Sequence, residues 1–232
     1  MARRPSRLDQ IAKMTVDQRL SLSREKADKL VDQCIQIERI RANNRHLIFR
    51  DVFEGNLHHT FAGNAYESLR LTSFSFEVVR LMALWDKPAE NVFSIPEVMA
   101  LIADPAVIAQ ARSECIAEYG SEYVPLRRSA ERRFDRGLRH AQILASVLPT
   151  THRFKSLKRH RNKFYAHNLN DATISPKFGY ERKLLWSSER IVNALRGVLS
   201  SAGLDFRETR ALCERHADEF WHGVKWEKPE SA

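Results

Sequence analysis

Cysteines are scarce in this sequence and long apolar runs are absent, and each of these features excludes a class of protein. The three cysteines, Cys34, Cys115 and Cys213, lie far apart and form no C-x-x-C pattern. We therefore expect neither a disulfide framework nor a structural zinc site, and we expect a reduced, cytoplasmic location. No apolar run is long enough to cross a membrane, so we expect no membrane span. The basic start, MARRPSRLDQIAK, is followed by no apolar run and therefore does not resemble a secretory signal.

Motifs for metal, cofactor or serine-hydrolase chemistry are also missing. The chain contains no glycine-rich phosphate loop and no G-x-S-x-G. The pair His58-His59 has no third ligand at a recognisable spacing, and exposed loop histidines explain it better than a metal site. We therefore expect neither a metal nor a cofactor.

What remains is a globular, helix-rich composition. Hydrophobic residues make up 43% of the 232 residues, with only 8 Gly and 8 Pro. Apolar residues recur at helical spacing nearly throughout, and no strand-like alternation is present. We expect a basic flexible N-terminus at 1–14, a single all-α domain at 15–223 and a frayed C-terminus at 224–232. Helices are predicted over residues 15–52, 61–85, 127–148, 152–167, 180–201 and 207–223, with two short ones that begin at Ser94 and Asp104.

The helix predicted at 61–85 carries apolar residues on two sides. One row is Ala65, Leu69, Thr72, Phe76, Val79 and Ala83, and the other is Leu71, Phe74, Val78, Leu81 and Trp85. Because a helix with two apolar sides needs two partners, we expect burial on both sides.

Positive charge is concentrated in one segment. Residues 127–163 contain twelve Lys and Arg against two acids, whereas the rest of the chain has 26 Lys and Arg against 27 acids. A local basic patch is typical of a protein that binds a polyanion, usually nucleic acid. A solvated basic face would give the same composition.

The helix predicted at 127–148 separates its charges from its apolar residues. Phe134, Leu138, Ala141, Ala145 and Leu148 fall on one face, and Pro149 ends the helix. The opposite face carries a row of arginines that we predict to bind RNA: Arg128, Arg132, Arg136 and Arg139.

The next helix, predicted at 152–167, breaks this separation. Its apolar face is Phe154, Leu157, Phe164 and Tyr165, and Arg161 falls in the middle of that face. An inward arginine often marks a functional site, although it can also extend to solvent or pair with a buried carboxylate. His167 falls in the last turn, where the carbonyl end of the helix dipole favours a protonated imidazole.

The phrase LKRHRNKFYAH, residues 157–167, resembles the Arg-x4-6-His signature of the HEPN superfamily of ribonucleases. Arg–His spacings of this kind recur at Arg39–His46, Arg41–His46, Arg133–His140, Arg153–His160, Arg210–His216 and Arg215–His222. Arg161–His167 differs from these because a polar residue, Asn162, follows the arginine and a basic run precedes it. With the upstream SLRLTSFSFEVVRLMALWDK and SIPEVMALIAD, the chain is similar to the AbiU-like, abortive-infection branch over about residues 15–200.

The resemblance implies a HEPN-like helical bundle with long antiparallel helices and short extra ones, which dimerises and cleaves RNA without metal. RNA carries its own nucleophile, the 2′-OH, so proton transfer by His167 and phosphate binding by Arg161 would suffice. Asn162 would orient one of them, and the products would be a 2′,3′-cyclic phosphate and a 5′-OH. Further RNA contacts are predicted at Lys158, Arg159, His160 and Lys163.

Partners beyond RNA also follow from the resemblance. Arg161 and His167 lie about 120° apart on a helical wheel, so we expect a homodimer whose subunits share the active site. An antitoxin or regulatory protein is possible for a toxin-type antiphage effector. Leu169 stands where members silenced by nucleotidylation have a tyrosine, so that form of control is not expected. The alternative is a non-catalytic HEPN-like module that binds RNA or protein through the same basic helix.

Overall fold

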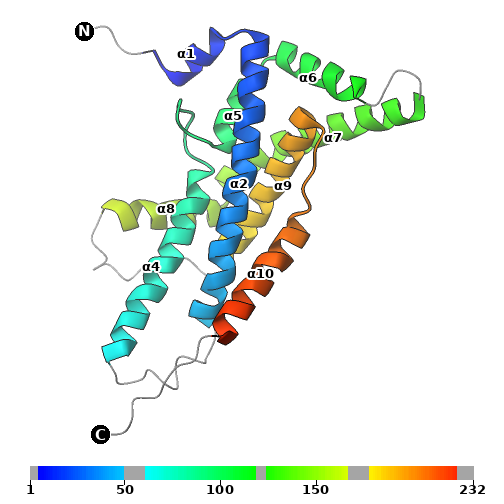
Figure 1. Cartoon of the computed structure of the whole chain (residues 1–232). Coiled ribbons are helices and arrows are strands. Elements are labelled where there is room, and N and C mark those ends of the chain that lie inside the picture. Colours follow the sequence, from blue (N-terminus) through cyan, green and yellow to red (C-terminus); the bar gives the residue numbers. More distant parts are fainter. Residues whose placement is uncertain (1–4, 50–60, 119–123, 167–177, 224–232) are drawn as a thin grey trace, which may run out of the picture.

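A long central helix organises the molecule (Figure 1). The computed structural model describes residues 5–49, 61–118, 124–166 and 178–223, and this part of the chain contains helices and turns but no strand. Helix α2 (Val16–Phe49) runs along the bundle and contacts α4 (Phe61–Ala83), α9 (Tyr180–Ser200) and α10 (Phe206–Gly223). The predicted all-α bundle with long helices is confirmed.

Short helices complete the bundle where their capping residues predict them. In α5 (Ile95–Leu101), Ser94 Oγ accepts a hydrogen bond from the Glu97 N–H at 3.3 Å. In α6 (Pro105–Ala117), Asp104 caps the Ala106 N–H at 2.9 Å. Both helices have a proline in the first turn, where the missing N–H costs nothing.

The core lies where the apolar rows of α2, α4 and α9 meet. Fully buried side chains include Leu30, Cys34 and Ile37 of α2, Leu81 of α4, and Leu185, Ile191 and Leu195 of α9. Burying each large aliphatic side chain contributes roughly 1.5–3 kcal/mol. The same contacts hold α4 and α9 rigidly against α2.

Part of the segment expected to be a flexible tail, residues 1–14, is helical in the structure, which describes it from residue 5 onward. Residues Arg7–Ala12 form α1, which begins with a reciprocal capping box between Ser6 and Asp9. Ile11 is buried, and Arg7 Nη2 lies 2.7 Å from Oε1 of the fully buried Glu97. The capping box, the buried Ile11 side chain and the ion pair with Glu97 therefore hold α1 in place, although the composition of this segment predicted no helix.

Among the described side chains of α4, the buried ones lie in its second half, mainly on one side. Phe74, Val78, Leu81 and Trp85 are in the core, and Val79 joins them. However, Leu69 and Phe76 of the first row are about half exposed, at 51% and 49%. Burial on both sides is therefore wrong for this stretch within a single chain.

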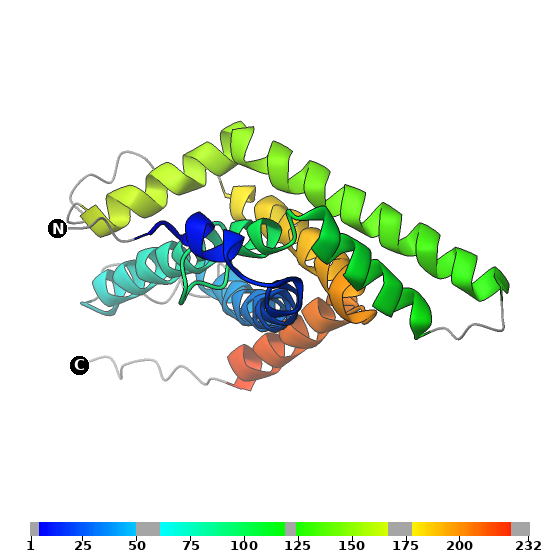
Figure 2. The ribbon, with the colours of Figure 1, turned by 90° about the horizontal axis from the view of Figure 1, so that it is seen from above.

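The two basic helices follow each other along one side of the bundle (Figure 2). Helix α7 (Val124–Val147) continues through the 3₁₀ turn η1 (Leu148–Thr150), which contains Pro149, into α8 (His152–Ala166). α7 packs on α9 and α6, and α8 packs on α4 and α9. Helix α10 lies on the opposite side of the molecule.

Candidate functional site

The centre of the candidate site is the Arg161 side chain on α8. Its Nη1 lies 2.5 Å from Asp86 Oδ1, just beyond the end of α4, and 3.4 Å from the Met82 carbonyl oxygen. The Arg161 side chain is 21% exposed and that of Asp86 is 42% exposed. The inward position predicted for Arg161 is therefore confirmed, and its partner is a carboxylate at the bundle surface.

The neighbouring motif residues are divided between described and undescribed parts of the chain. Asn162 is exposed, and its Oδ1 lies 3.4 Å from Arg161 Nε, a long hydrogen bond. His167 lies outside the described residues, directly after the end of α8 at Ala166. In the structure Asn162 thus lies close to Arg161. That His167 also lies close to Arg161 stays a prediction.

The residues on either side of Arg161 include further cations and one histidine that contacts α4. Lys158 and Arg159 are exposed, and Lys163 is partly buried. His160 Nε2 is in hydrogen-bond contact with Ser75 Oγ at 3.2 Å, and its ring centroid lies 5.9 Å from that of Phe74. His160 is therefore directed toward α4, a position less suited to RNA contact than that of Lys158 or Arg159.

The arginine row of α7 has the exposure that nucleic-acid contact requires. Arg128, Arg132, Arg136 and Arg139 are all exposed. Within the described ranges none of these four forms an ion pair, whereas their neighbours Arg127 and Asp135 bond to Glu131 and Arg112. Their guanidinium groups are consequently available to phosphates.

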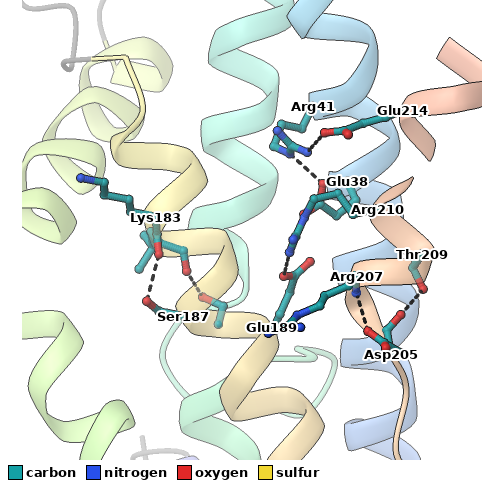
Figure 3. A network of polar contacts seen from close by, with 12 residues as sticks. Glu38, Arg41, Lys183, Ser187, Glu189, Asp205, Arg207, Thr209, Arg210 and Glu214 are labelled. Carbon is teal, nitrogen blue, oxygen red and sulfur yellow. Dashed lines mark hydrogen bonds and ion pairs between the residues drawn. The ribbon is translucent and has the colours of Figure 1, made fainter. Parts of the chain in front are cut away.

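The other Arg–His spacings include one with the same five-residue gap, and its arginine has a structural role. Arg210 Nε lies 3.1 Å from Glu38 and its Nη2 lies 2.7 Å from Glu189, as Figure 3 shows. Glu38 also accepts from Arg41 at 2.7 Å. Both glutamates are buried, and burial together with the nearby Glu38 carboxylate raises the pKa of Glu189. Because the Arg210 guanidinium group is already bonded to Glu38 and Glu189, it is not free to bind a phosphate.

A cavity of about 370 Å³ opens between α2, α4 and the start of α9. Phe74, which also contacts His160, forms part of its wall, and Arg45 and Arg182 stand at its exposed edge. Buried Glu77 lines it and accepts from Asn44 Nδ2 at 2.7 Å. Burial raises the pKa of Glu77 to about 8.

Three residues of this region were not predicted from the sequence. Asp86, just beyond α4, contacts Arg161, and Ser75 of α4 contacts His160, each some eighty positions earlier in the chain. Glu77 of α4 lines the neighbouring cavity. The sequence offered one indication for Asp86, because it lies in the WDK turn of the stretch that resembles the AbiU-like branch. Nothing in the local pattern distinguished Ser75 or Glu77 from other polar residues of α4.

Neither a metal cluster nor a membrane span is found in the part of the chain that the structure describes. In these ranges, no group of three or more His, Cys, Asp or Glu side chains is arranged to hold a metal ion. Among the described helices, none is long and apolar enough to span a membrane.

Comparison with known proteins places this geometry in a family. The HEPN family AbiU2 matches residues 24–220, which include α8, the Arg161–Asp86 pair and nearly all of the bundle. No curated protein and no solved structure matches the chain. Since the match covers most of its length, the chain belongs to the AbiU2 family of HEPN proteins.

Proposed function

We propose that this protein is a metal-independent endoribonuclease whose active site contains Arg161, Asn162 and His167. The observation that carries the proposal is the inward Arg161, which Asp86 holds at the edge of the bundle and which begins the Arg161–His167 motif within the region that matches the family. Arg161 Nη2 has no hydrogen bond within the described residues, so this arm is available to a phosphate oxygen.

Each residue has a defined chemical task. His167 takes the proton of the RNA 2′-OH or protonates the leaving 5′-oxygen. Arg161 stabilises the charge that develops on the phosphate, and its planar fork suits two phosphate oxygens better than a lysine would. Asn162, within reach of Arg161 Nε, orients the guanidinium. The products are a 2′,3′-cyclic phosphate and a 5′-OH.

The basic helices supply the binding of RNA. The exposed arginines of α7 and the cations Lys158 and Arg159 of α8 contact the phosphate backbone without reading sequence. The strand thereby reaches the end of α8, where His167 follows.

We further propose that the working unit is a homodimer with the active site at its interface. The exposed apolar face of α4, with Leu69 and Phe76 about half exposed, offers a self-complementary surface. A twofold contact through α4 brings two copies of the adjacent α8 together, so that one subunit's His167 serves the other's Arg161. In the cell this activity fits an abortive-infection effector or toxin, held inactive by an antitoxin or regulatory protein.

One observation favours a second candidate, a non-catalytic module that binds RNA or protein. The Asp86 carboxylate occupies one arm of the Arg161 guanidinium, as a purely structural ion pair would. In that case α7 and α8 bind RNA without cleaving it.

Incubation of the purified protein with mixed RNA in the presence of EDTA separates the two candidates. The ribonuclease predicts fragments that end in 2′,3′-cyclic phosphates, detected by their resistance to phosphatase unless first opened by acid. Intact RNA that is nevertheless retarded in a gel would instead support the binding module.

A further inference from the structure

A second cavity, remote in sequence from the Arg161 motif, lies between α6, α7 and α9. It has a volume of about 400 Å³, within the range of small-ligand sites. Its walls come from Cys115 of α6, the stretch of α7 around Gly137, and α9 from Arg190 to its end. We call it the α7/α9 pocket.

The α7/α9 pocket is lined by two arginines and a histidine but by no acidic side chain. These residues are Arg133 and His140 of α7 and Arg190 of α9. Arg133 and His140 stand seven positions apart and so lie on the same face of α7, on either side of Gly137. Within the described ranges none of the three side chains forms a hydrogen bond or ion pair. Cations gathered around a concave surface without counter-charges attract an anion.

Two glycines line this pocket and have different roles. A Cβ at Gly137 would stand 3.3 Å from Val198 Cγ2, so this glycine allows the close packing of α7 on α9. At Gly197, inside α9, a Cβ would meet no atom within 4 Å. Glycine inside a helix lowers the stability of the helix by about 1 kcal/mol relative to alanine. At Gly197 no neighbouring atom would exclude the larger residue. The absent side chain leaves volume in the pocket.

We infer that the α7/α9 pocket binds the phosphates of a nucleotide, held by Arg133, His140 and Arg190. Two guanidinium forks and an imidazole donor match phosphate oxygens, and the volume left by Gly197 accommodates the rest of the ligand. The nucleotide is either part of an RNA strand or free in solution, and both sources present the same chemistry. The RNA source rests on the proposed function, whereas a free nucleotide would be an effector of the protein.

The pocket is distinct from the arginine row already assigned to RNA. All three of Arg132, Arg133 and Arg136 are exposed, but only Arg133 lines the pocket between α7 and α9. Substitutions can therefore remove the pocket charges and leave the row intact.

The test measures binding to the full-length protein with two probes, a fluorescent RNA 12-mer of mixed sequence and a panel of free nucleoside mono- and triphosphates. Arg133→Gln/Arg190→Gln removes two pocket charges. Arg207→Gln/Arg215→Gln on α10 removes the same charge from the opposite side and serves as the matched control. Gly197→Leu fills the pocket without changing charge, and Gly197→Ala, which should raise the melting temperature, verifies that the helix accepts a side chain there.

We expect the pocket double variant and Gly197→Leu to weaken binding of at least one probe by about tenfold or more, the loss typical of a charge-assisted hydrogen bond. The α10 control should change affinity less than about threefold, since it alters only long-range attraction. Loss confined to the free nucleotides identifies an effector, and loss confined to the 12-mer identifies an RNA subsite.

Binding that survives both pocket variants, or that falls equally in the α10 control, would overturn the inference, as would the failure of every probe to bind. All measurements use the His167→Ala background and need no cleavage. A ribonuclease assay that fails therefore leaves this result unchanged, and the converse also holds.

Discussion

Arg161 on α8 and Asp86 beyond the end of α4 form an ion pair of 2.5 Å that joins two helices 75 positions apart in the chain. The pair fixes the direction of one guanidinium arm while the side chain keeps partial access to solvent. Asp86 thereby acts as a positioning residue for Arg161 under the proposed chemistry. A purely structural pair would instead influence only the stability of the α4–α8 contact.

Loosening this pair should reduce cleavage more than stability. We expect Asp86→Asn to lower kcat by about tenfold or more, since small displacements of a catalytic group are costly. The free energy of unfolding should change by about 1 kcal/mol or less, because the carboxylate is partly exposed. Arg161→Lys should be as inactive as Arg161→Ala, since a point charge cannot replace the fork. Melting curves and RNA cleavage rates measured together decide the matter, and an Asp86→Asn protein that loses stability but keeps its kcat would contradict the positioning role.

The arginine row of α7 should govern the salt dependence of RNA binding. Replacing Arg128, Arg132, Arg136 and Arg139 by glutamine should weaken binding to all sequences alike. It should also reduce the slope of log affinity against log salt concentration by about one unit for each phosphate contact that is lost. Fluorescence titrations at several salt concentrations measure both quantities. An unchanged affinity and slope would show that the row is only a solvated face.

The exposed face of α4 should carry the dimer. Leu69→Glu/Phe76→Glu places two charges on the apolar face and should convert a dimer to a monomer with little specific activity. Burial of roughly 1,200 Å² or more is expected for a stable pair. The matched control is Leu212→Glu/Phe220→Glu on α10, where both side chains are also exposed. Light scattering at micromolar concentration, with activity across a dilution series, is the measurement. A wild-type monomer with full activity per chain would refute the shared site.

Buried Glu77 should make the protein less stable as the pH rises. Its pKa in the folded protein is about 8, against an ordinary value of 4.5, because burial disfavours the carboxylate. Between these values the folded protein retains a proton that the unfolded chain has released, so the free energy of unfolding falls as the pH rises through this window. Glu77→Gln can still accept the hydrogen bond from Asn44. The substitution should remove this loss of stability at high pH, which amounts to at most about several kcal/mol.

Melting temperatures at pH 5 and pH 8.5 test this prediction, with Glu114→Gln as the control. The pKa of Glu114 is lowered by hydrogen bonds from Gln110 and Arg24, so its contribution has the opposite sign. Glu77→Gln should gain stability over the wild type mainly at the higher pH, and Glu114→Gln should not. An equal effect of Glu77→Gln at both pH values would contradict a titrating Glu77.

Local signals in the sequence predicted most of the helices. The starts of the two short helices at Ser94 and Asp104 were predictable, because a capping residue and the proline of the first turn lie within four residues of each other. The helical wheel predicted the inward direction of Arg161 for the same reason. Helix α1 was missed because a six-residue helix carries too little periodicity, and its anchor, Glu97, is 90 positions away from Arg7.

Contacts between distant segments were not predictable in this way. No pattern near Arg161 specifies Asp86, and none near Arg133 specifies Arg190, since each pairing depends on how helices pack. The apolar row through Leu69 and Phe76 was expected to be buried, whereas both side chains are about half exposed in the structure. Periodicity alone does not say what covers an apolar row, so its packing in a homodimer stays a prediction.

The most direct test of the ribonuclease compares His167→Ala with His216→Ala in an RNA cleavage assay that contains EDTA. His167 and His216 each follow an arginine at the same spacing, but Arg161 pairs with one partly exposed carboxylate, Asp86, whereas Arg210 is bound to two buried glutamates. We predict that His167→Ala abolishes the release of 2′,3′-cyclic phosphate ends while its helical content and melting temperature stay near those of the wild type. His216→Ala should cleave at the wild-type rate. A His167→Ala protein that still cleaves RNA would contradict the assignment of the active site.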